Sequence, residues 1–147
     1  MVIPVMSPEW KAEFSYRHTG LPSGAGIYCN ILHFSKGAEI GERGDRHPCL
    51  YYNVPMQRFE MASVVNNEDV YTSKQSIVLH QTYHFVFQQR YLSNGIYQYE
   101  VIIDGQIYNS LVNNQAKQFY DMKAYVSNPW IQSCVGIISD VKFTNFQ

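Results

Sequence analysis

The sequence contains no long apolar run, and this absence excludes one class of protein at the outset. A membrane-spanning helix needs roughly 20 predominantly apolar residues, and no stretch of the 147 residues approaches that length. Residues 1–6 are too short for the apolar core of a secretory signal peptide. No Asn-x-Ser/Thr acceptor for N-glycosylation occurs either. We therefore expect no membrane insertion, and nothing in these features indicates secretion.

An excess of charge of either sign is also lacking. The chain has 11 Lys and Arg against 12 Asp and Glu, which gives a formal net charge of -1. A nearly neutral chain has no general electrostatic attraction to nucleic acid or to anionic membranes. The basic residues are not clustered into a groove that could follow a phosphate backbone. Nucleic acid is therefore not an expected partner.

Cysteine is scarce, and the three residues Cys29, Cys49 and Cys134 cannot all pair within one chain. If residues 27–35 and 48–54 form neighbouring strands, a Cys29–Cys49 disulfide is geometrically conceivable, but the sequence does not supply the distances that it needs. The simpler expectation is three reduced, mostly buried thiols that pack as small apolar groups. The redox compartment stays open.

Aromatic residues are abundant, with 12 Tyr, 8 Phe and 2 Trp, and such side chains favour pleated, half-buried β-structure. Apolar and polar residues alternate with the period of two that a one-sided strand requires, as in residues 10–17. This pattern predicts about nine to eleven short strands and no helix, in a sandwich or barrel. The expected strands span residues 10–17, 27–35, 48–54, 57–65, 70–72, 76–79, 83–91, 97–103, 106–111, 119–127 and 135–146.

The clearest local signal lies in residues 83–111. Tyr83, Phe85 and Phe87 fall on one face of a first strand, and a polar turn follows. Asp104 and Gly105 then separate two further β-rich runs. A tight hairpin turn needs residues that tolerate a positive φ, which this dipeptide supplies. The stretch predicts an antiparallel meander of three strands.

The length indicates one domain, because 147 residues can bury one sizeable core but are few for two. We expect a lead-in segment over residues 1–9, which contains Pro4 and Pro8, and a single β-sandwich domain over residues 10–147. A turn-rich loop is expected over residues 18–26. The first and last strands of the domain should be neighbours, since the termini of single domains often lie close together.

A strand led by an aromatic residue, then a loop, then a hairpin of the form Y-x-V-x-I-D-G resembles the core of the concanavalin A-like lectin/glucanase superfamily, especially its laminin G-like and pentraxin-like modules. Residues 30–34 with 44–48, and residues 119–130 with 136–138, agree in order and spacing. The resemblance covers about residues 10–146 and extends to modules of invertebrate extracellular proteins. It implies an all-β, two-sheet antiparallel jelly-roll sandwich, extracellular or secreted as part of a longer protein.

The most polar loop, residues 39–47, contains the carboxylates Glu39, Glu42 and Asp45. Several relatives in the superfamily depend on calcium, which takes oxygen ligands from carboxylates. Arg43 and Arg46 are interleaved with these carboxylates, however, and a cation site rarely tolerates two positive charges. The preferred interpretation is structural, with Asp45 and Arg46 forming an ion pair or capping the loop backbone. We expect no cofactor, with calcium as the alternative.

A catalytic arrangement is not apparent in the sequence. Endoglucanases of the superfamily carry Glu-x-Asp-x-x-Glu on one strand, and no such string occurs here. The spacing of Glu39, Glu42 and Asp45 does not place them on one face of a strand. The five histidines also lack metal-ligand spacing. We do not expect an enzyme.

Binding is the remaining role. Sugars are held by aromatic faces and by Asn, Gln, Asp and Arg side chains that bond the hydroxyls. By resemblance, the chain is a non-catalytic recognition module that binds carbohydrate or a glycoprotein through a concave sheet face or adjacent loops. The alternative is a structural or adhesion domain for protein–protein contacts, including self-association. The candidate ligand-binding residues are Asp45, Arg46, Asn53, Gln88, Arg90, Tyr97, Tyr99, Asn113 and Trp130.

Overall fold

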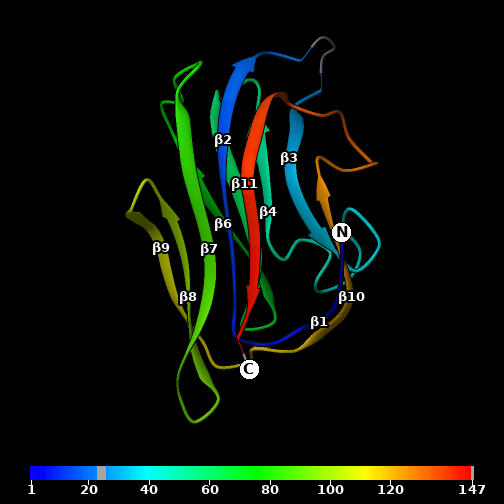
Figure 1. The fold of residues 1–147 in the computed structure, drawn as a ribbon, viewed down its shortest axis with the longest axis vertical. Coiled ribbons are helices and arrows are strands. Elements are labelled where there is room, and N and C mark those ends of the chain that lie inside the picture. The colour runs from blue at the N-terminus through cyan, green and yellow to red at the C-terminus, as the bar shows by residue number, and fades with distance from the viewer. Residues whose placement is uncertain (23–25, 147) are drawn as a thin grey trace.

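The computed structural model describes residues 1–22 and 26–146. In these residues the chain forms eleven strands and no helix, so none of the described segments is a helix that could cross a membrane. The strands make two antiparallel sheets that pack face to face (Figure 1). The predicted all-β architecture is confirmed. The turn-rich loop predicted over residues 18–26 includes residues 23–25, and the predicted domain includes residue 147, all of which lie outside the described residues.

The first sheet has six strands in the order β1-β10-β3-β4-β5-β6. Every neighbouring pair is antiparallel. The strands of this sheet are β1 (Val2–Met6), β10 (Phe119–Val126), β3 (Tyr28–Ser35), β4 (Cys49–Asn53), β5 (Arg58–Val65) and β6 (Glu68–Lys74).

The second sheet has five strands in the order β11-β2-β7-β8-β9. The strands of this sheet are β11 (Val135–Asn145), β2 (Trp10–Gly20), β7 (Thr82–Ser93), β8 (Ile96–Ile103) and β9 (Gln106–Asn113). β7, β8 and β9 are the predicted meander, which is confirmed. Asp104 and Gly105 have φ values of 52° and 77°, as the predicted tight turn requires. β2 and β11, the first and last predicted strands, pair directly.

The core lies between the sheets and is built largely from aromatic rings. β2 buries every second residue along most of its length, as its sequence predicts. From the second sheet, Phe14 stacks on Phe85 with ring centroids 5.3 Å apart. Phe59 of the first sheet meets Phe85 edge-on, also at 5.3 Å. Interlocking rings of this kind fix the spacing and orientation of the two sheets.

Residues 1–9 differ from the expectation of a lead-in segment. Val2–Met6 forms β1, which pairs with β10 at the edge of the first sheet, and Ile3 and Met6 are buried in the core. The sequence hides this strand because it contributes only two inward residues and contains Pro4. A proline is tolerated on an edge strand, where its missing N–H can face away from the neighbouring strand. The short strand expected over residues 76–79 is absent; that segment is irregular.

The cysteine expectations are also corrected. Cys29 forms a disulfide with Cys134, whose Cα atom lies 4.9 Å away, while Cys49 is a buried free thiol. Cys29 and Cys49 do lie on neighbouring strands, β3 and β4. Cys29 belongs to the core between the sheets, whereas Cys49 packs in a separate small cluster with Tyr51 and Ala62. The two thiols therefore face opposite sides of the first sheet and cannot pair.

Candidate functional site

The outer face of the first sheet, which points away from the core, carries a row of tyrosines. In β4, Leu50 and Tyr52 face the core, so Tyr51 faces outward. The antiparallel register places Tyr51 beside Glu60 of β5, and Tyr71 of β6 beside Ala62 of the same strand. Strand alternation and register therefore bring outward residues of β4, β5 and β6 together.

Two loops wall this face and turn it into a pocket of about 730 Å³. Residues 36–48 connect β3 to β4, and residues 127–134 connect β10 to β11. Both loops, the end of the β2–β3 connection at Gly26 and Ile27, and four strands of the first sheet contribute to the walls. The lining residues are Gly26, Ile27, Tyr28, Glu39, Arg46, Tyr51, Glu60, Met61, Ala62, Tyr71, Ile131 and Gln132.

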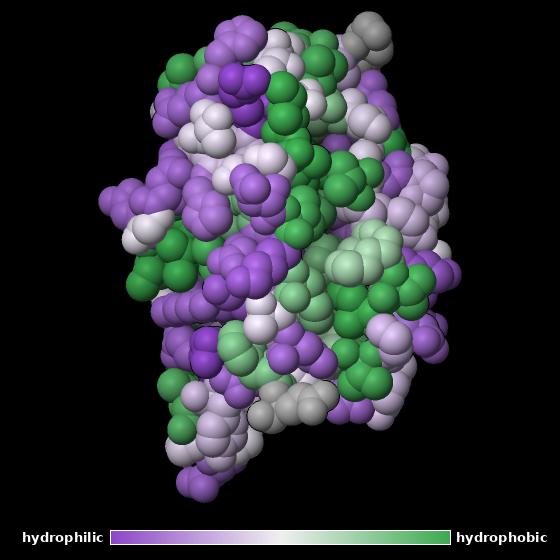
Figure 2. Space-filling model, in the orientation of Figure 1, coloured by the Kyte–Doolittle hydropathy of each residue, from purple (hydrophilic) through white to green (hydrophobic). Residues whose placement is uncertain are grey.

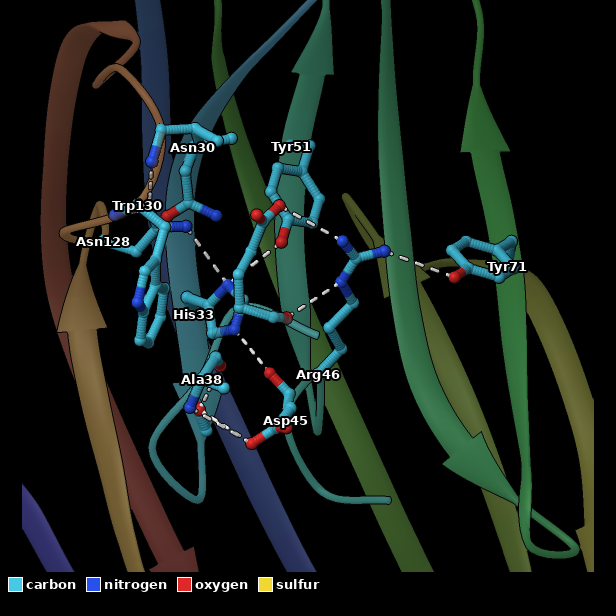
Figure 3. Close-up of polar contacts among 12 residues, drawn as sticks. Asn30, His33, Ala38, Asp45, Arg46, Tyr51, Tyr71, Asn128 and Trp130 are labelled. Carbon is cyan, nitrogen blue, oxygen red and sulfur yellow. Dashed lines mark hydrogen bonds and ion pairs between the residues drawn. The ribbon is translucent and has the colours of Figure 1, made fainter. Parts of the chain in front are cut away.

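Arg46 is the central polar group of the pocket (Figure 3). Its guanidinium donates Nη2–H to Glu39 Oε1 at 3.2 Å and Nε–H to the Glu39 carbonyl at 3.2 Å. A third donor, Nη1–H, reaches the Tyr71 hydroxyl at 3.3 Å. The guanidinium carbon lies 5.4 Å from the centre of the Tyr51 ring, within the range of a cation–π contact. These contacts hold the side chain in one orientation across the sheet.

A buried histidine fixes the tyrosine beneath Arg46. His33 is fully buried, and its Nε2 lies against the Asp45 carbonyl oxygen, which can only accept, so Nε2 carries the proton. Nδ1 is then the acceptor for the Tyr51 hydroxyl at 3.1 Å and for the Asn128 amide at 3.3 Å. Burial is the main cause that lowers the pKa of His33 from 6.5 to about 4. Burial likewise raises the pKa of Tyr51, so both groups are neutral near pH 7.

Glu60 is the second carboxylate of the pocket. Its Oε1 accepts hydrogen bonds from Asn53 Nδ2 at 3.1 Å and from Arg58 Nε at 2.7 Å. The Tyr28 hydroxyl lies close by, and its pKa is raised, first by burial and second by its hydrogen bond to Glu60. Glu60 is therefore paired with a cation and surrounded by groups that hold it in place.

Asp45 has a structural role in the loop of residues 36–48. Its carboxylate accepts hydrogen bonds from the Glu42 N–H at 2.8 Å and from the Ser35 hydroxyl at 3.2 Å, so it caps the backbone of the loop. Arg46 pairs with Glu39 instead of Asp45. Glu42 pairs with Lys36. The three loop carboxylates thus have separate partners, and within residues 1–22 and 26–146 no three His, Cys, Asp or Glu side chains converge as a metal site.

The disulfide anchors the loop of residues 127–134 against β3. Besides the Cys29–Cys134 bond, the Asn30 N–H donates to the Gln132 carbonyl at 2.9 Å, and the Cys134 N–H donates to the Asn30 carbonyl at 3.1 Å. Trp130 of this loop packs on His33 with ring centroids 5.4 Å apart (Figure 3). The pocket wall formed by Ile131 and Gln132 is therefore held by covalent, polar and aromatic contacts.

The structure brings together four of the nine candidate ligand-binding residues on the pocket side. Arg46 lines the pocket, Asn53 bonds the lining residue Glu60, Trp130 packs on His33, and Asp45 caps the loop that carries Arg46. The other five belong to the second sheet: Gln88 bonds Glu100, Arg90 pairs with Glu9, Tyr97 packs on Tyr91, Tyr99 is in the core, and Asn113 is buried against Gln89.

Sequence reasoning did not single out Tyr28, Glu60, Tyr71 and Gln132 as pocket residues. They come from four separate segments, and only the strand order and register bring them together. The local signal for the tyrosines is period-two alternation. This pattern indicates which residues face outward but not which strands lie beside them.

No protein-family model and no curated protein matches the sequence. Solved structures do match the fold. A carbohydrate binding module from Bacillus subtilis is similar over 95% of this chain and 76% of its own, with 10% identity and a TM-score of 0.52. A family 7 alginate lyase in complex with substrate is similar over 96% of this chain and 63% of its own, with 12% identity and a TM-score of 0.57.

A third similar structure is an alginate lyase from Pseudomonas aeruginosa, with 15% identity, 94% of this chain, 65% of its own chain and a TM-score of 0.53. The chain thus spans slightly less than two thirds of the length of these lyases. Together with the two antiparallel sheets, the similarity shows that the chain has the concanavalin A-like jelly-roll fold. The predicted fold class is confirmed.

Proposed function

We propose that this protein is a non-catalytic recognition module that binds carbohydrate, free or on a glycoprotein, in the pocket on the outer face of the first sheet. The observation that carries the proposal is the composition of the walls. Tyr28 and Tyr71 supply exposed aromatic surface, Tyr51 lies beneath Arg46, and Arg46 and Glu60 supply fixed polar groups beside the rings. Sugars require this combination, because their rings have apolar C–H patches and a rim of hydroxyls.

The size and rigidity of the pocket support the proposal. Its volume of about 730 Å³ lies within the range of small-molecule sites. The polar groups are already held by neighbours, so a ligand would not need to order them, and preorganised groups lower the entropic cost of binding. The similar structures, a carbohydrate binding module and alginate lyases, are those of proteins that engage carbohydrate.

A non-catalytic role fits the state of the titratable groups. Both ring nitrogens of His33 are engaged, and the Tyr51 hydroxyl donates to that histidine. A general acid or base must reach the proton that it transfers, and these two groups are directed toward each other and the protein. Glu39 and Glu60 are each paired with an arginine. We expect no depolymerisation of a bound polysaccharide, as measured by new reducing or unsaturated ends.

A glycan array followed by calorimetry tests the proposal. Tyr71, which is 56% exposed on β6, is replaced by alanine; the matched control is Tyr91→Ala, at 51% exposure on the second sheet. Loss of one stacking ring should weaken a saccharide found by the array about tenfold or more. Tyr91→Ala should bind as the unchanged protein does. Equal loss in both variants, or no saccharide binder on the array, would contradict the proposal.

An extracellular or secreted location agrees with this function. The Cys29–Cys134 disulfide supports it, because disulfides persist in oxidising compartments and are rare in the cytosol. Labelling of free thiols in protein taken from its natural source checks this proposal. Only Cys49 should react after unfolding without a reductant.

Self-association is the alternative function, and one observation favours it. Val135, Ile137 and Val141 of the edge strand β11 are exposed, and Figure 2 shows apolar side chains along the middle of the face where β11 runs. An exposed apolar edge can pair with a second copy of the chain. A stable oligomer that forms without any ligand would favour this alternative over carbohydrate recognition.

A further inference from the structure

The charged groups that line the pocket are already paired with charges on neighbouring side chains. Arg46, its only lining cation among the described residues, directs its donors to Glu39 and Tyr71 at 3.2–3.3 Å. The side chains of Arg46 and Glu39 are only 17% and 30% exposed. An incoming anion would therefore have to displace an existing ion pair to reach the guanidinium.

The carboxylates of the pocket outnumber its cations. Glu39 and Glu60 both line it, and Glu60 is balanced by Arg58, which is not among the lining residues. A carboxylate on a ligand would thus meet Glu39 and Glu60 and find no unpaired cation among the described lining residues to balance its charge. Like-charge contacts of this kind are strongly unfavourable.

Uncharged hydroxyl groups fit the same positions well. The bonds from Asn53 and Arg58 both end on Glu60 Oε1, and the side-chain bond from Arg46 ends on Glu39 Oε1. None of these three bonds ends on an Oε2 atom, and a carboxylate oxygen has two lone pairs, so the Oε2 atoms can accept hydrogen bonds from ligand hydroxyls, in Glu60 alongside the bond from the Tyr28 hydroxyl. A hydrogen bond from a neutral hydroxyl to a carboxylate is stronger than one between two neutral groups.

We infer that the pocket selects an uncharged saccharide and rejects uronate sugars. This inference rests on the proposed function and narrows it. It distinguishes the expected ligand of this pocket from alginate, on which the similar lyases act and whose sugars are uronates. The two carboxylates act as hydroxyl acceptors, and the paired Arg46 acts as a rigid platform rather than as an anion receptor.

The test uses matched pairs of sugars that differ only in a CH₂OH or a carboxylate at one carbon. Oligosaccharides of glucose, mannose and galactose are compared with those of glucuronate, mannuronate and galacturonate by calorimetry at low salt. The best neutral sugar should bind at least about tenfold tighter than its uronate counterpart, the ratio that 1.4 kcal/mol of discrimination produces.

The variant Glu39→Gln tests the cause. It removes the charge that neutralises Arg46 while keeping the size of the side chain, so the uronate partner should gain about tenfold or more in affinity. Glu42→Gln is the matched control, because Glu42 lies in the same loop but pairs with Lys36 and does not line the pocket. Thermal unfolding checks that both variants fold.

The outcomes separate the two proposals. Neutral sugars that bind, together with a gain of uronate binding in Glu39→Gln alone, support the inference. Uronates that bind the unchanged protein as tightly as their neutral partners overturn it but leave carbohydrate recognition standing. An absence of binding to any sugar of either kind removes both.

Discussion

His33 is the residue on which the shape of the pocket depends most directly. It orients the Tyr51 hydroxyl, contacts Trp130, and bonds the Asp45 carbonyl, so one ring joins β3, β4 and both loops. Its role requires the neutral form, because Nδ1 must accept while Nε2 donates. The state of this ring therefore links the stability of the fold to the geometry of the site.

Acid should destabilise the protein through His33. Its pKa is 6.5 in the unfolded chain and about 4 in the folded one. Above pH 6.5 neither state binds the proton; between pH 6.5 and 4 only the unfolded state does, so the free energy of unfolding falls. We expect a loss of about 3 kcal/mol from this residue across that interval. Urea unfolding from pH 7 to pH 4 measures it.

The variant His33→Gln should show a shallower loss of stability over the same interval, since glutamine does not titrate. The control is His84→Gln, because His84 is exposed on β7 of the second sheet. An identical pH dependence in His33→Gln and the unchanged protein would contradict the assignment. NMR titration of the imidazole gives an independent measurement.

Among the connecting elements, the loop of residues 36–48 depends on Gly44. Its φ is 102°, and a Cβ atom there would lie 2.8 Å from Cε1 of the buried Phe119. Gly44→Ala combines backbone strain with this overlap and should lower the free energy of unfolding by about 2–4 kcal/mol. Gly95→Ala, with a φ of 74° and nothing within 4 Å, should cost only about 1 kcal/mol. Denaturant titration compares the two, and equal costs would contradict the packing argument.

The loop of residues 127–134 depends on the Cys29–Cys134 disulfide. The bond spans 105 residues, and its loss should lower the free energy of unfolding by about 2–4 kcal/mol. It should also weaken ligand binding, because Ile131 and Gln132 lose their anchor. Thermal unfolding of Cys29→Ser/Cys134→Ser measures the first effect and calorimetry the second. The control is Cys49→Ala, which keeps the disulfide, so a reductant should still lower its free energy of unfolding. A Cys29→Ser/Cys134→Ser variant with unchanged stability would contradict this account.

The strands of the second sheet could be predicted because their signals are local. Tyr83, Phe85 and Phe87 alternate with polar residues, and Asp104 with Gly105 defines a turn without reference to distant residues. β1 could not be predicted, since it exists only through pairing with β10. The disulfide was missed for a related reason: its partners come close only after residues 127–134 fold back on β3.

The pocket was less accessible to sequence reasoning than the fold. The polar loop was expected to hold Asp45 and Arg46 as an ion pair or as caps of its backbone; Asp45 does cap the backbone, whereas the ion pair of Arg46 is with Glu39. Tyr71 and Tyr28 line one pocket only because β3, β4, β5 and β6 are neighbours in that order. The strand order of a jelly roll is a long-range property, and periodicity alone does not contain it.

At the scale of the whole molecule, the two sheets have different roles. The second sheet contains the meander and covers one side of the core. The pocket lies on the outer face of the first sheet, on the opposite side of the sandwich. Candidate residues on the second sheet, such as Gln88 and Tyr97, are therefore separated from the pocket by the full thickness of the core. Substitution of either by alanine offers a direct comparison with Tyr71→Ala.

We expect the protein to be a monomer in solution, because its sheet edges are interrupted. Pro4 lies on β1, Glu68 and Asp69 on β6, and β11 has register shifts near Gly136 and before Lys142. Such features disfavour edge-to-edge pairing. Size-exclusion chromatography with light scattering should give one subunit mass across a wide concentration range. A stable dimer that Ile137→Lys dissociates would contradict this and identify β11 as the interface.

The link between Cys29 and Cys134 also sets an order of events during biosynthesis. The first sheet draws on both ends of the chain, and the crosslink cannot close until residue 134 has left the ribosome. A nascent chain that ends before this point has β3, β4, β5 and β6 but lacks one wall of the pocket. The wall formed by Ile131 and Gln132 is therefore the last part of the pocket to be completed.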